Sequence, residues 1–280
     1  MTYVPRGYSD IHRMFLQTMM SCRMLKYEEA CVSFCKISQS VTGIEDEMTQ
    51  TPRAKDMEKA ITVINQVIKR FYMEIRLALD EYTSDRYYLL VNLVSNEITS
   101  KTFGRFTAAE MEFFKKVLFE IVCSENGYIT STECLNLNSV LPGNTTKSEV
   151  EILIDKFCRE LWLCEKDGKI YLSLLGIVEL EPLLSSVYKD YITTCLLCNH
   201  IVIQGYRCSE CNILFHLYCV KHYCRRQMLV CPQCKADQPE MEAAVRHILS
   251  PDIDDDNFNT SNSASSSRKG KGVGKTSVRK

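Results

Sequence analysis

A run of eight regularly paired metal-binding side chains between positions 195 and 234 constrains this chain more than any other feature. Seven cysteines and one histidine form four pairs, and two residues separate the members of each pair. This spacing lets both side chains of a tight turn reach one ion, and zinc completes its tetrahedron with two such turns. Because about forty residues hold too small a core to fold alone, the pattern predicts two closed, structural zinc sites. The predicted ligands are Cys195, Cys198, Cys208, Cys211, His216, Cys219, Cys231 and Cys234.

Spacing alone leaves open which pairs share an ion. A sequential arrangement joins the first pair to the second and the third pair to the fourth, whereas a cross-braced arrangement joins the first to the third and the second to the fourth. The ligand order of four cysteines, one histidine and three cysteines resembles the cross-braced RING and PHD fingers. From that resemblance we expect one site of Cys195, Cys198, His216 and Cys219, and a second of Cys208, Cys211, Cys231 and Cys234.

The residues between the ligands favour a RING finger over a PHD finger. PHD fingers usually carry a large aromatic residue two positions before the seventh ligand, where this chain has Leu229. RING fingers that recruit ubiquitin-conjugating enzymes tend to place an apolar residue before the second ligand and proline after the seventh, as Leu197 and Pro232 do here. Lys235 follows the last ligand, where many RING ligases carry a basic residue that contacts ubiquitin. Ordinary packing of the zinc-binding turns would explain Leu197 or Pro232 alone.

The composition is that of a globular protein whose cysteines are not expected to form disulfides. Apolar residues make up 45% of the chain and charged residues 25%, and the formal net charge is −1, which does not indicate nucleic acid or an anionic membrane as a partner of the whole chain. No segment approaches the roughly 18 apolar residues of a membrane span, and the N-terminal residues lack the apolar core of a secretory signal. We therefore expect the 15 cysteines to be thiols or metal ligands rather than disulfides.

Few other residues suggest a site. Cys31 and Cys35 lie four positions apart on a predicted helix, without a further cysteine or histidine nearby, and are expected to be core thiols. Three further residues of the cysteine-rich segment lie outside its pairs: Cys224, His200 and His222. The alternative is that one of them takes the place of one of the eight predicted ligands. No catalytic triad, carboxylate pair or nucleotide-binding loop is evident, and no catalytic side chain is predicted.

Two segments before the finger share one pattern of helices followed by a β-hairpin. Residues 1–100 are predicted to form a first winged-helix domain and residues 101–192 a second. In the second, Thr107 and Glu110 have the spacing of a capping box, and Asp167-Gly168 marks a hairpin turn. The expected elements of the first domain are helices near 11–20, 30–37 and 55–71 and strands at 75–79 and 87–94; those of the second are helices beginning near 107, 130 and 146, a hairpin at 163–172 and a helix at 176–192.

The predicted fold is therefore α+β, with tandem winged-helix domains, a cross-braced two-zinc RING-like finger at 193–240 and a tail at 250–280. The tail begins with an acidic cluster and a Ser/Asn-rich stretch and ends in six basic residues among its last thirteen. A segment with so few apolar side chains cannot offset the entropy lost on ordering, so we expect it to be disordered. Its basic end is expected to bind DNA weakly or to act as a nuclear address, unless it is simply solvated.

Over residues 8–240 the chain resembles the family of the first non-SMC element, the RING-bearing subunit of the SMC five–six chromosome complex. The matching segments are Phe15-Leu-Gln-Thr-Met, Trp162-Leu before a glycine-centred hairpin, Glu179-Leu-Glu, and Ile203-Gln-Gly-Tyr-Arg-Cys208. Many members carry a tryptophan shortly after the last ligand, where this chain has Lys235-Ala-Asp-Gln-Pro239. The resemblance implies a nuclear protein that pairs with a MAGE-type subunit and other members of that complex and acts as a ubiquitin ligase in DNA repair and recombination.

Two functional hypotheses follow. In the first, the finger binds a ubiquitin-conjugating enzyme and restrains its thioester-linked ubiquitin in a reactive conformation, a catalysis by positioning that needs no nucleophile. In the second, the chain is a non-catalytic architectural subunit whose finger holds a protein partner. The third helix of the second domain has a net acidic surface, so we expect the winged helices to bind protein, and DNA to be reached only through the complex or weakly through the tail.

Overall fold

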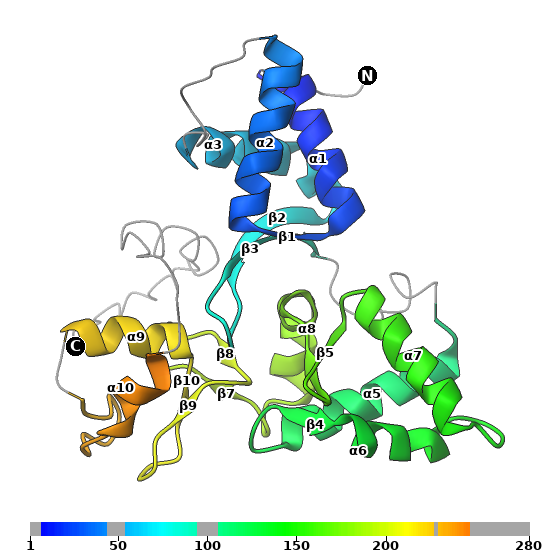
Figure 1. Cartoon of the computed structure of the whole chain (residues 1–280), viewed down its shortest axis with the longest axis vertical. Coiled ribbons are helices and arrows are strands. Elements are labelled where there is room, and N and C mark those ends of the chain that lie inside the picture. Colours follow the sequence, from blue (N-terminus) through cyan, green and yellow to red (C-terminus); the bar gives the residue numbers. More distant parts are fainter. Residues whose placement is uncertain (1–6, 44–53, 94–105, 227–228, 247–280) are drawn as a thin grey trace, which may run out of the picture. The chain divides into compact units, whose positions relative to one another are not determined.

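Two three-stranded sheets, each packed against helices, precede the cysteine-rich segment (Figure 1). The structure, a computed structural model, describes residues 7–43, 54–93, 106–226 and 229–246, all of which belong to one unit of connected contacts. The tail predicted at 250–280 lies outside the described residues. Among the described residues, no helix is long and apolar enough to cross a membrane.

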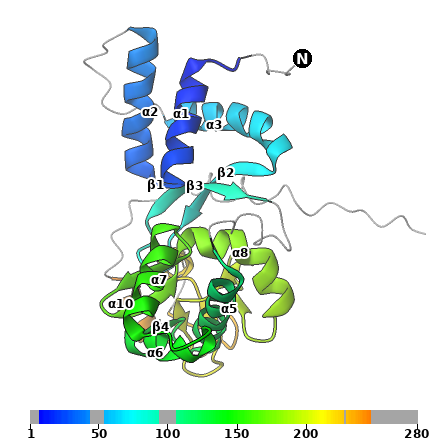
Figure 2. The same ribbon diagram turned by 90° about the vertical axis from the view of Figure 1, so that its right-hand side faces the viewer.

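The first sheet has the strand order β1-β3-β2, and Figure 2 shows α1, α2 and α3 on one side of it. Its core includes Phe15 and Phe34, whose rings meet edge to face with centroids 5.4 Å apart. The elements are α1 (Asp10–Cys22), β1 (Met24–Lys26), α2 (Tyr27–Thr42), α3 (Ala54–Ile68), the 3-10 turn η1 (Lys69–Phe71), β2 (Met73–Leu79) and β3 (Arg86–Asn92).

The third helix of this domain ends earlier than its apolar pattern predicts. The apolar pattern of the helix predicted at 55–71 places Phe71 on its buried face, and this prediction is wrong, because the Phe71 side chain is 63% exposed. The α-helix ends at Ile68, a single 3-10 turn follows, and Tyr72 adopts a left-handed conformation with φ of 56°. This reversal starts β2 and rotates Phe71 out of the core. Val94, at the end of the predicted strand, lies outside the described residues.

The second sheet repeats the first topology, with the order β4-β6-β5. The predicted capping box is confirmed: the backbone N–H of Glu110 donates to Thr107 Oγ1 over 3.2 Å, and that of Thr107 to the Glu110 carboxylate over 2.6 Å. The elements are α5 (Ala108–Cys123), β4 (Tyr128–Thr130), α6 (Ser131–Leu135), η2 (Asn136–Val140), α7 (Lys147–Arg159), β5 (Leu163–Lys166), β6 (Lys169–Leu172) and α8 (Leu174–Val187).

Two local features set the shape of this second domain. Asp167 and Gly168 both have positive φ, the backbone of a two-residue hairpin turn that matches strand twist. Ser173 caps α8, which ends at Val187 rather than at the predicted position 192. The core is aromatic, because Phe114 packs against both Phe157 and Trp162, with ring centroids 5.0 and 5.8 Å away.

The first sheet is fastened to α8 of the second domain. Leu89 of β3 belongs to a buried cluster with Leu174 and Leu175. Beside this cluster, the Arg23 guanidinium lies 3.1 Å from the Glu179 carboxylate, whose side chain is 4% exposed. Burial raises the pKa of Glu179, although Arg23 opposes the shift. The first domain and α8 are thus connected by an apolar contact and a partly buried ion pair.

Candidate metal centre

The cysteine-rich segment folds as short strands around tight turns that carry the predicted ligands. Gly205 allows two of these strands to meet, because a Cβ atom there would lie 2.0 Å from the carbonyl oxygen of Phe215. The elements are β7 (Thr193–Thr194), β8 (Ile201–Val202), β9 (Tyr206–Arg207), β10 (Leu214–Phe215), α9 (Leu217–Arg226) and α10 (Glu240–Val245). Strand β7 pairs with β8 and β9 with β10, and α10 packs against α9.

Three of the four ligand pairs share one backbone turn. In the first, the N–H of Asn199 donates to the carbonyl of Cys195 over 2.7 Å, and in the last, the N–H of Lys235 donates to that of Cys231 over 3.0 Å. The residue four positions after the first cysteine is left-handed in each turn, with φ between 60° and 64° for Asn199, Asn212 and Lys235. Asparagine tolerates this conformation better than lysine, so the last turn is the more strained.

The turns bring the eight side chains together in two groups that match the cross-braced arrangement and not the sequential one. Within each group the ligand atoms all lie within 4.8 Å of one another, and the first group is the more buried. Neither group contains His200, which instead lies 3.9 Å from the Glu181 carboxylate, or Cys224. The groups are Cys195, Cys198, His216 and Cys219, and Cys208, Cys211, Cys231 and Cys234.

The atomic spacing fits tetrahedral zinc. Two sulfur atoms bound to one zinc ion at about 2.3 Å lie about 3.8 Å apart. Cys208 Sγ lies 3.7 Å from Cys234 Sγ, and Cys211 Sγ lies 3.7 Å from Cys231 Sγ. In the mixed group a sulfur and a nitrogen ligand are expected about 3.6 Å apart. The two groups are therefore compatible with two zinc ions.

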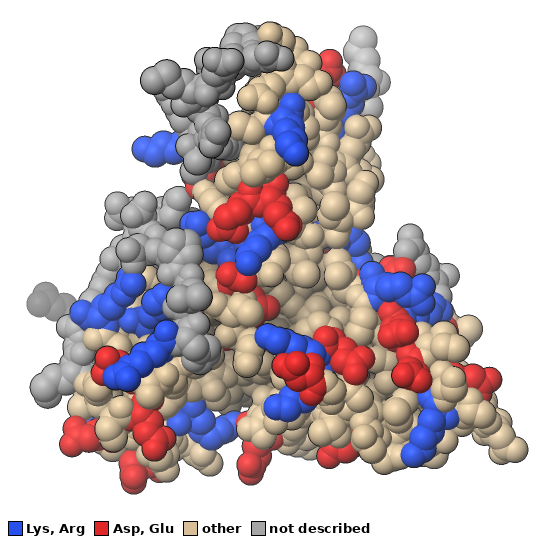
Figure 3. Space-filling view, in the orientation of Figure 1, with Lys and Arg blue, Asp and Glu red and all other residues tan. Residues whose placement is uncertain are grey.

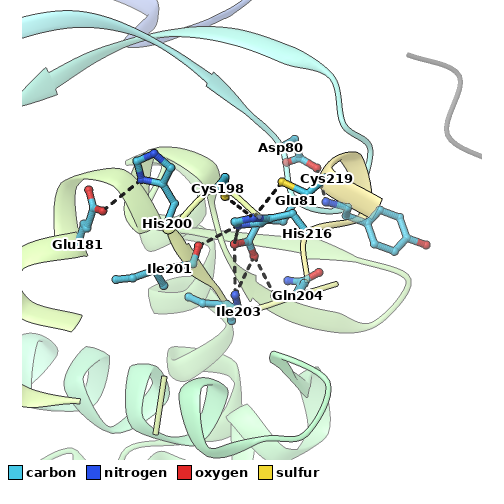
Figure 4. Close-up of polar contacts among 11 residues, drawn as sticks. Asp80, Glu81, Glu181, Cys198, His200, Ile201, Ile203, Gln204, His216 and Cys219 are labelled. Carbon is cyan, nitrogen blue, oxygen red and sulfur yellow. Dashed lines mark hydrogen bonds and ion pairs between the residues drawn. The ribbon is translucent and has the colours of Figure 1, made fainter. Parts of the chain in front are cut away.

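His216 completes the first group through Nδ1. This nitrogen lies 3.3 Å from Cys198 Sγ and 3.9 Å from Cys219 Sγ, while Nε2 lies 2.9 Å from the carbonyl oxygen of Ile201 on β8 (Figure 4). A second contact to Nε2 comes from the carboxylate of Glu81, 3.3 Å away. The ring is 2% exposed and stacks on Tyr218. An Nε2–H donor held by acceptors leaves Nδ1 free to bind metal.

The thiols of the ligand cysteines differ in pKa. Burial raises the pKa of the Cys208 thiol, but backbone N–H groups of Cys211 and Glu210 stabilise its thiolate and bring the value to about 7. Hydrogen bonds with Cys198 and Cys219 lower the pKa of Cys195, whereas those with Cys195 and Cys198 raise that of Cys219. The ionised sulfur is the form that zinc binds.

The three residues predicted to contact a conjugating enzyme or ubiquitin occupy both ends of the finger. Leu197 is half-buried in the turn of the first group, and Pro232 is half-buried in the last turn of the second. Lys235 is exposed, and its ammonium donates to the carbonyl of Pro232 over 2.9 Å, so these two residues are brought together. Helix α9 begins at Leu217, two residues before the sixth ligand, and ends at Arg226, before the seventh.

Two polar residues that support the centre carry no signal in the sequence. Gln238 is 2% exposed beyond the last ligand, and its Oε1 accepts a hydrogen bond of 2.7 Å from the hydroxyl of Tyr206. Glu81 is 6% exposed and comes from the hairpin tip of the first domain, more than a hundred positions before the finger. Each lies in an irregular segment whose residue types are ordinary for a turn.

Comparisons with known proteins agree with this architecture. Residues 12–180 match the family described as "Nse1 non-SMC component of SMC5-6 complex", and residues 195–234 match the family described as "RING-like domain". The chain belongs to the Nse1 family.

Relatives of the Nse1 family extend the match over most of the chain. It is 34% identical over 228 residues to the non-structural maintenance of chromosomes element 1 homolog of Homo sapiens, covering 81% of this chain and 83% of that protein. It is 31% identical over 234 residues to the Bos taurus homolog, with coverage of 81% and 83%. A chain of a solved structure titled "Nse1-Nse3-Nse4 complex" superposes with a TM-score of 0.73 at 28% identity, covering 84% of this chain and 99% of that one.

Proposed function

We propose that this Nse1-family chain binds two zinc ions through its eight paired ligands and acts as a RING-type E3 ubiquitin ligase subunit of the SMC5-6 complex. The observation that carries the proposal is the closed, cross-braced pair of ligand groups within the segment that matches a RING-like domain. All four positions of each group are side chains of the chain itself, so zinc would have no open position for a substrate. Catalysis would come from positioning a ubiquitin-charged conjugating enzyme.

The proposed binding surface for that enzyme combines Leu197 with α9 and the last turn. Leu197 and Pro232 would provide apolar contact area, and Lys235 a donor to ubiquitin. Because the carbonyl of Pro232 accepts from the ammonium of Lys235, the lysine is held beside the proline and less of its rotamer freedom remains to be lost on binding. Interfaces of this kind are small and transient, and activity would be low without a partner subunit.

The proposed partner is a MAGE-type subunit. The matched structure is titled as a complex of Nse1, Nse3 and Nse4, and we propose that this chain forms the corresponding assembly. A protein partner also suits the surface charge, because acidic and basic side chains are intermixed over the face in Figure 3, without a continuous basic stripe. On α7, three acidic side chains balance three basic ones, so the helix offers no excess of positive charge to phosphates. On the ground of membership of that complex, we propose a nuclear role in DNA repair and recombination.

A second candidate function is architectural. Ile201 and Ile203 of the finger are buried in the core of the second domain. A finger built into the body in this way would serve to hold a partner rigidly even if it never met a conjugating enzyme.

Ubiquitin discharge from a panel of charged conjugating enzymes separates the two functions. The assay is run with the full chain, with and without the MAGE-type subunit, and zinc content is measured in parallel. If the finger is a ligase, Leu197→Ala should slow discharge about tenfold or more while both zinc ions are retained, because it removes contact area and leaves every ligand in place. Ile152→Ala, which shortens an aliphatic side chain 61% exposed on α7, is the matched control in the reactions without the MAGE-type subunit, where it should discharge like wild type.

The ligase proposal fails if neither condition accelerates discharge. The architectural function then remains. Accelerated discharge that Leu197→Ala retains in full would instead overturn only the proposed contact of Leu197 with the conjugating enzyme.

A further inference from the structure

The carboxylate of Glu81 connects the first winged-helix domain to a ligand of the first zinc site. Glu81 lies in the turn between β2 and β3, and its side chain is 6% exposed. One oxygen lies 3.3 Å from His216 Nε2, the ring nitrogen opposite the one that faces the cysteines. Figure 4 shows the carboxylate reaching under the histidine ring from a different part of the chain.

The same carboxylate binds the backbone of the finger. The N–H of Gln204 donates to Oε2 over 2.9 Å, and the N–H of Ile203 lies 3.2 Å from both oxygens. A buried carboxylate needs such donors, because an unpaired charge would be costly to desolvate. Glu81 therefore contacts both the ligand His216 and residues 203–204, which follow strand β8.

The turn that carries Glu81 is held by hydrogen bonds of its own. The carboxylate of Asp80 accepts from the N–H groups of Tyr82 and Thr83 over 3.0 and 2.8 Å. The N–H of Ser84 donates to the carbonyl of Asp80 over 2.9 Å, and Ser84 is left-handed, with φ of 60°. Because these bonds lie within the turn, the position of Glu81 is set by the first domain.

We propose that Glu81 positions His216, a ligand of the first zinc site. Zinc retention at this site and docking of the first domain onto the finger are then coupled. His216 Nε2 lies 2.9 Å from the Ile201 carbonyl oxygen, to which it is hydrogen-bonded, and the Glu81 carboxylate lies 3.3 Å from the same nitrogen. Together these two groups orient the ring and make it a stronger ligand, and loss of such a partner typically weakens metal affinity about 10- to 100-fold. Among the described residues, no hydrogen bond or ion pair joins Glu81 to the second site, which contains only cysteines. Coupling is reciprocal, so zinc loss at the first site releases the hairpin tip.

The test is Glu81→Gln in the full chain. Zinc transfer to a chromogenic chelator is followed over time, and a cobalt-substituted sample assigns each phase, since a site of three sulfurs and one nitrogen absorbs differently from an all-sulfur site. The affinity of the mixed site should fall about 10- to 100-fold, while that of the all-cysteine site is unchanged. Removal of metal from the mixed site should also speed amide hydrogen exchange at Ile203 and Gln204, whose N–H groups donate to Glu81.

Glu181→Gln is the matched control. Glu181 also faces a histidine of the finger, His200, at 3.9 Å, but this histidine belongs to neither ligand group. Both zinc affinities should equal those of wild type. If Glu81→Gln does not fold, Glu81→Asp keeps the charge but withdraws it by one methylene group and should give a smaller selective loss.

This role of Glu81 rests on the zinc assignment proposed above but not on ligase activity, and the outcomes keep the two apart. Fewer than two zinc ions in wild-type protein would overturn the assignment itself. Two ions in wild type, with unchanged release from a folded Glu81 variant or an equal change at both sites, would overturn only the role of Glu81.

Discussion

Replacing Gly127 with alanine tests how closely the finger is packed against the second domain. Gly127 lies between α5 and β4 with φ of +70°, and a Cβ atom there would lie 2.5 Å from the carbonyl oxygen of Ile203 and 2.8 Å from Cγ of Gln204. The oxygen is backbone, so it cannot move without shifting the finger. Gly168, in the β5–β6 turn, has a similar φ of +68°, but no atom lies within 4 Å of the position that its Cβ atom would take.

Comparison of the two glycine-to-alanine variants separates the cost of conformational strain from the cost of steric contact. A left-handed alanine costs about 1–2 kcal/mol, and Gly168→Ala should lose only that amount. Gly127→Ala adds an overpacking cost of about 1–3 kcal/mol, for a total loss of about 2–5 kcal/mol. The difference of about 1–3 kcal/mol measures the contact with Ile203 and Gln204.

The single tryptophan makes this difference measurable. Trp162 is 4% exposed in the core that also buries Ile203, so its fluorescence follows unfolding of the second domain. With a urea dependence of about 2 kcal/mol per M, the unfolding midpoint of Gly127→Ala should lie about 0.5–1.5 M below that of Gly168→Ala. Equal midpoints for the two variants would refute the close packing of the 203–204 segment on this turn.

Two further predictions concern the zinc sites and the helix caps. Cys208→Ser should lower the zinc content measured by elemental analysis and unfold the finger. Cys35→Ser should leave two zinc ions per chain, because Cys35 lies in α2, far from the ligand pattern in sequence. Two ions in both variants would contradict the ligand assignment. Thr146→Ala should destabilise the second domain by about 1 kcal/mol in the same urea titration, because Thr146 Oγ1 accepts the N–H of Glu149 at the start of α7, and an unchanged midpoint would show that solvent replaces the cap.

The features that were predictable from sequence are those whose cause is local. Two residues separate the members of each ligand pair, the Thr107–Glu110 box spans one helical turn, and Asp167-Gly168 forms its own hairpin turn. Strands β1 and β4 were not predicted, because three residues are too few to show an alternating pattern, and each is held by pairing with a later strand. Phe71 was misplaced because an apolar period does not reveal where a left-handed residue ends the helix.

Glu81 could not be found from sequence for a different reason. Its role depends on a hairpin tip meeting a strand segment 122 positions later, and an acidic residue in a polar turn is common by itself. The signal exists only in three dimensions, where one buried carboxylate accepts from two backbone N–H groups and faces a histidine. Long-range polar contacts of this kind leave no periodicity for a pattern to detect.

The buried contacts also bear on how the finger should be studied. Its Ile201 and Ile203 lie in the core of the second domain, and Glu81 reaches it from the first. Cutting the chain before β7 would expose both isoleucines and leave the Ile203 N–H without its carboxylate acceptor, and each change weakens the segment next to His216. An isolated finger that failed to promote ubiquitin discharge would therefore say little about the ligase proposal, because its first zinc site would have lost the groups that orient it. Only the full chain, with both zinc ions counted, distinguishes a scaffold from a ligase whose supporting contacts have been removed.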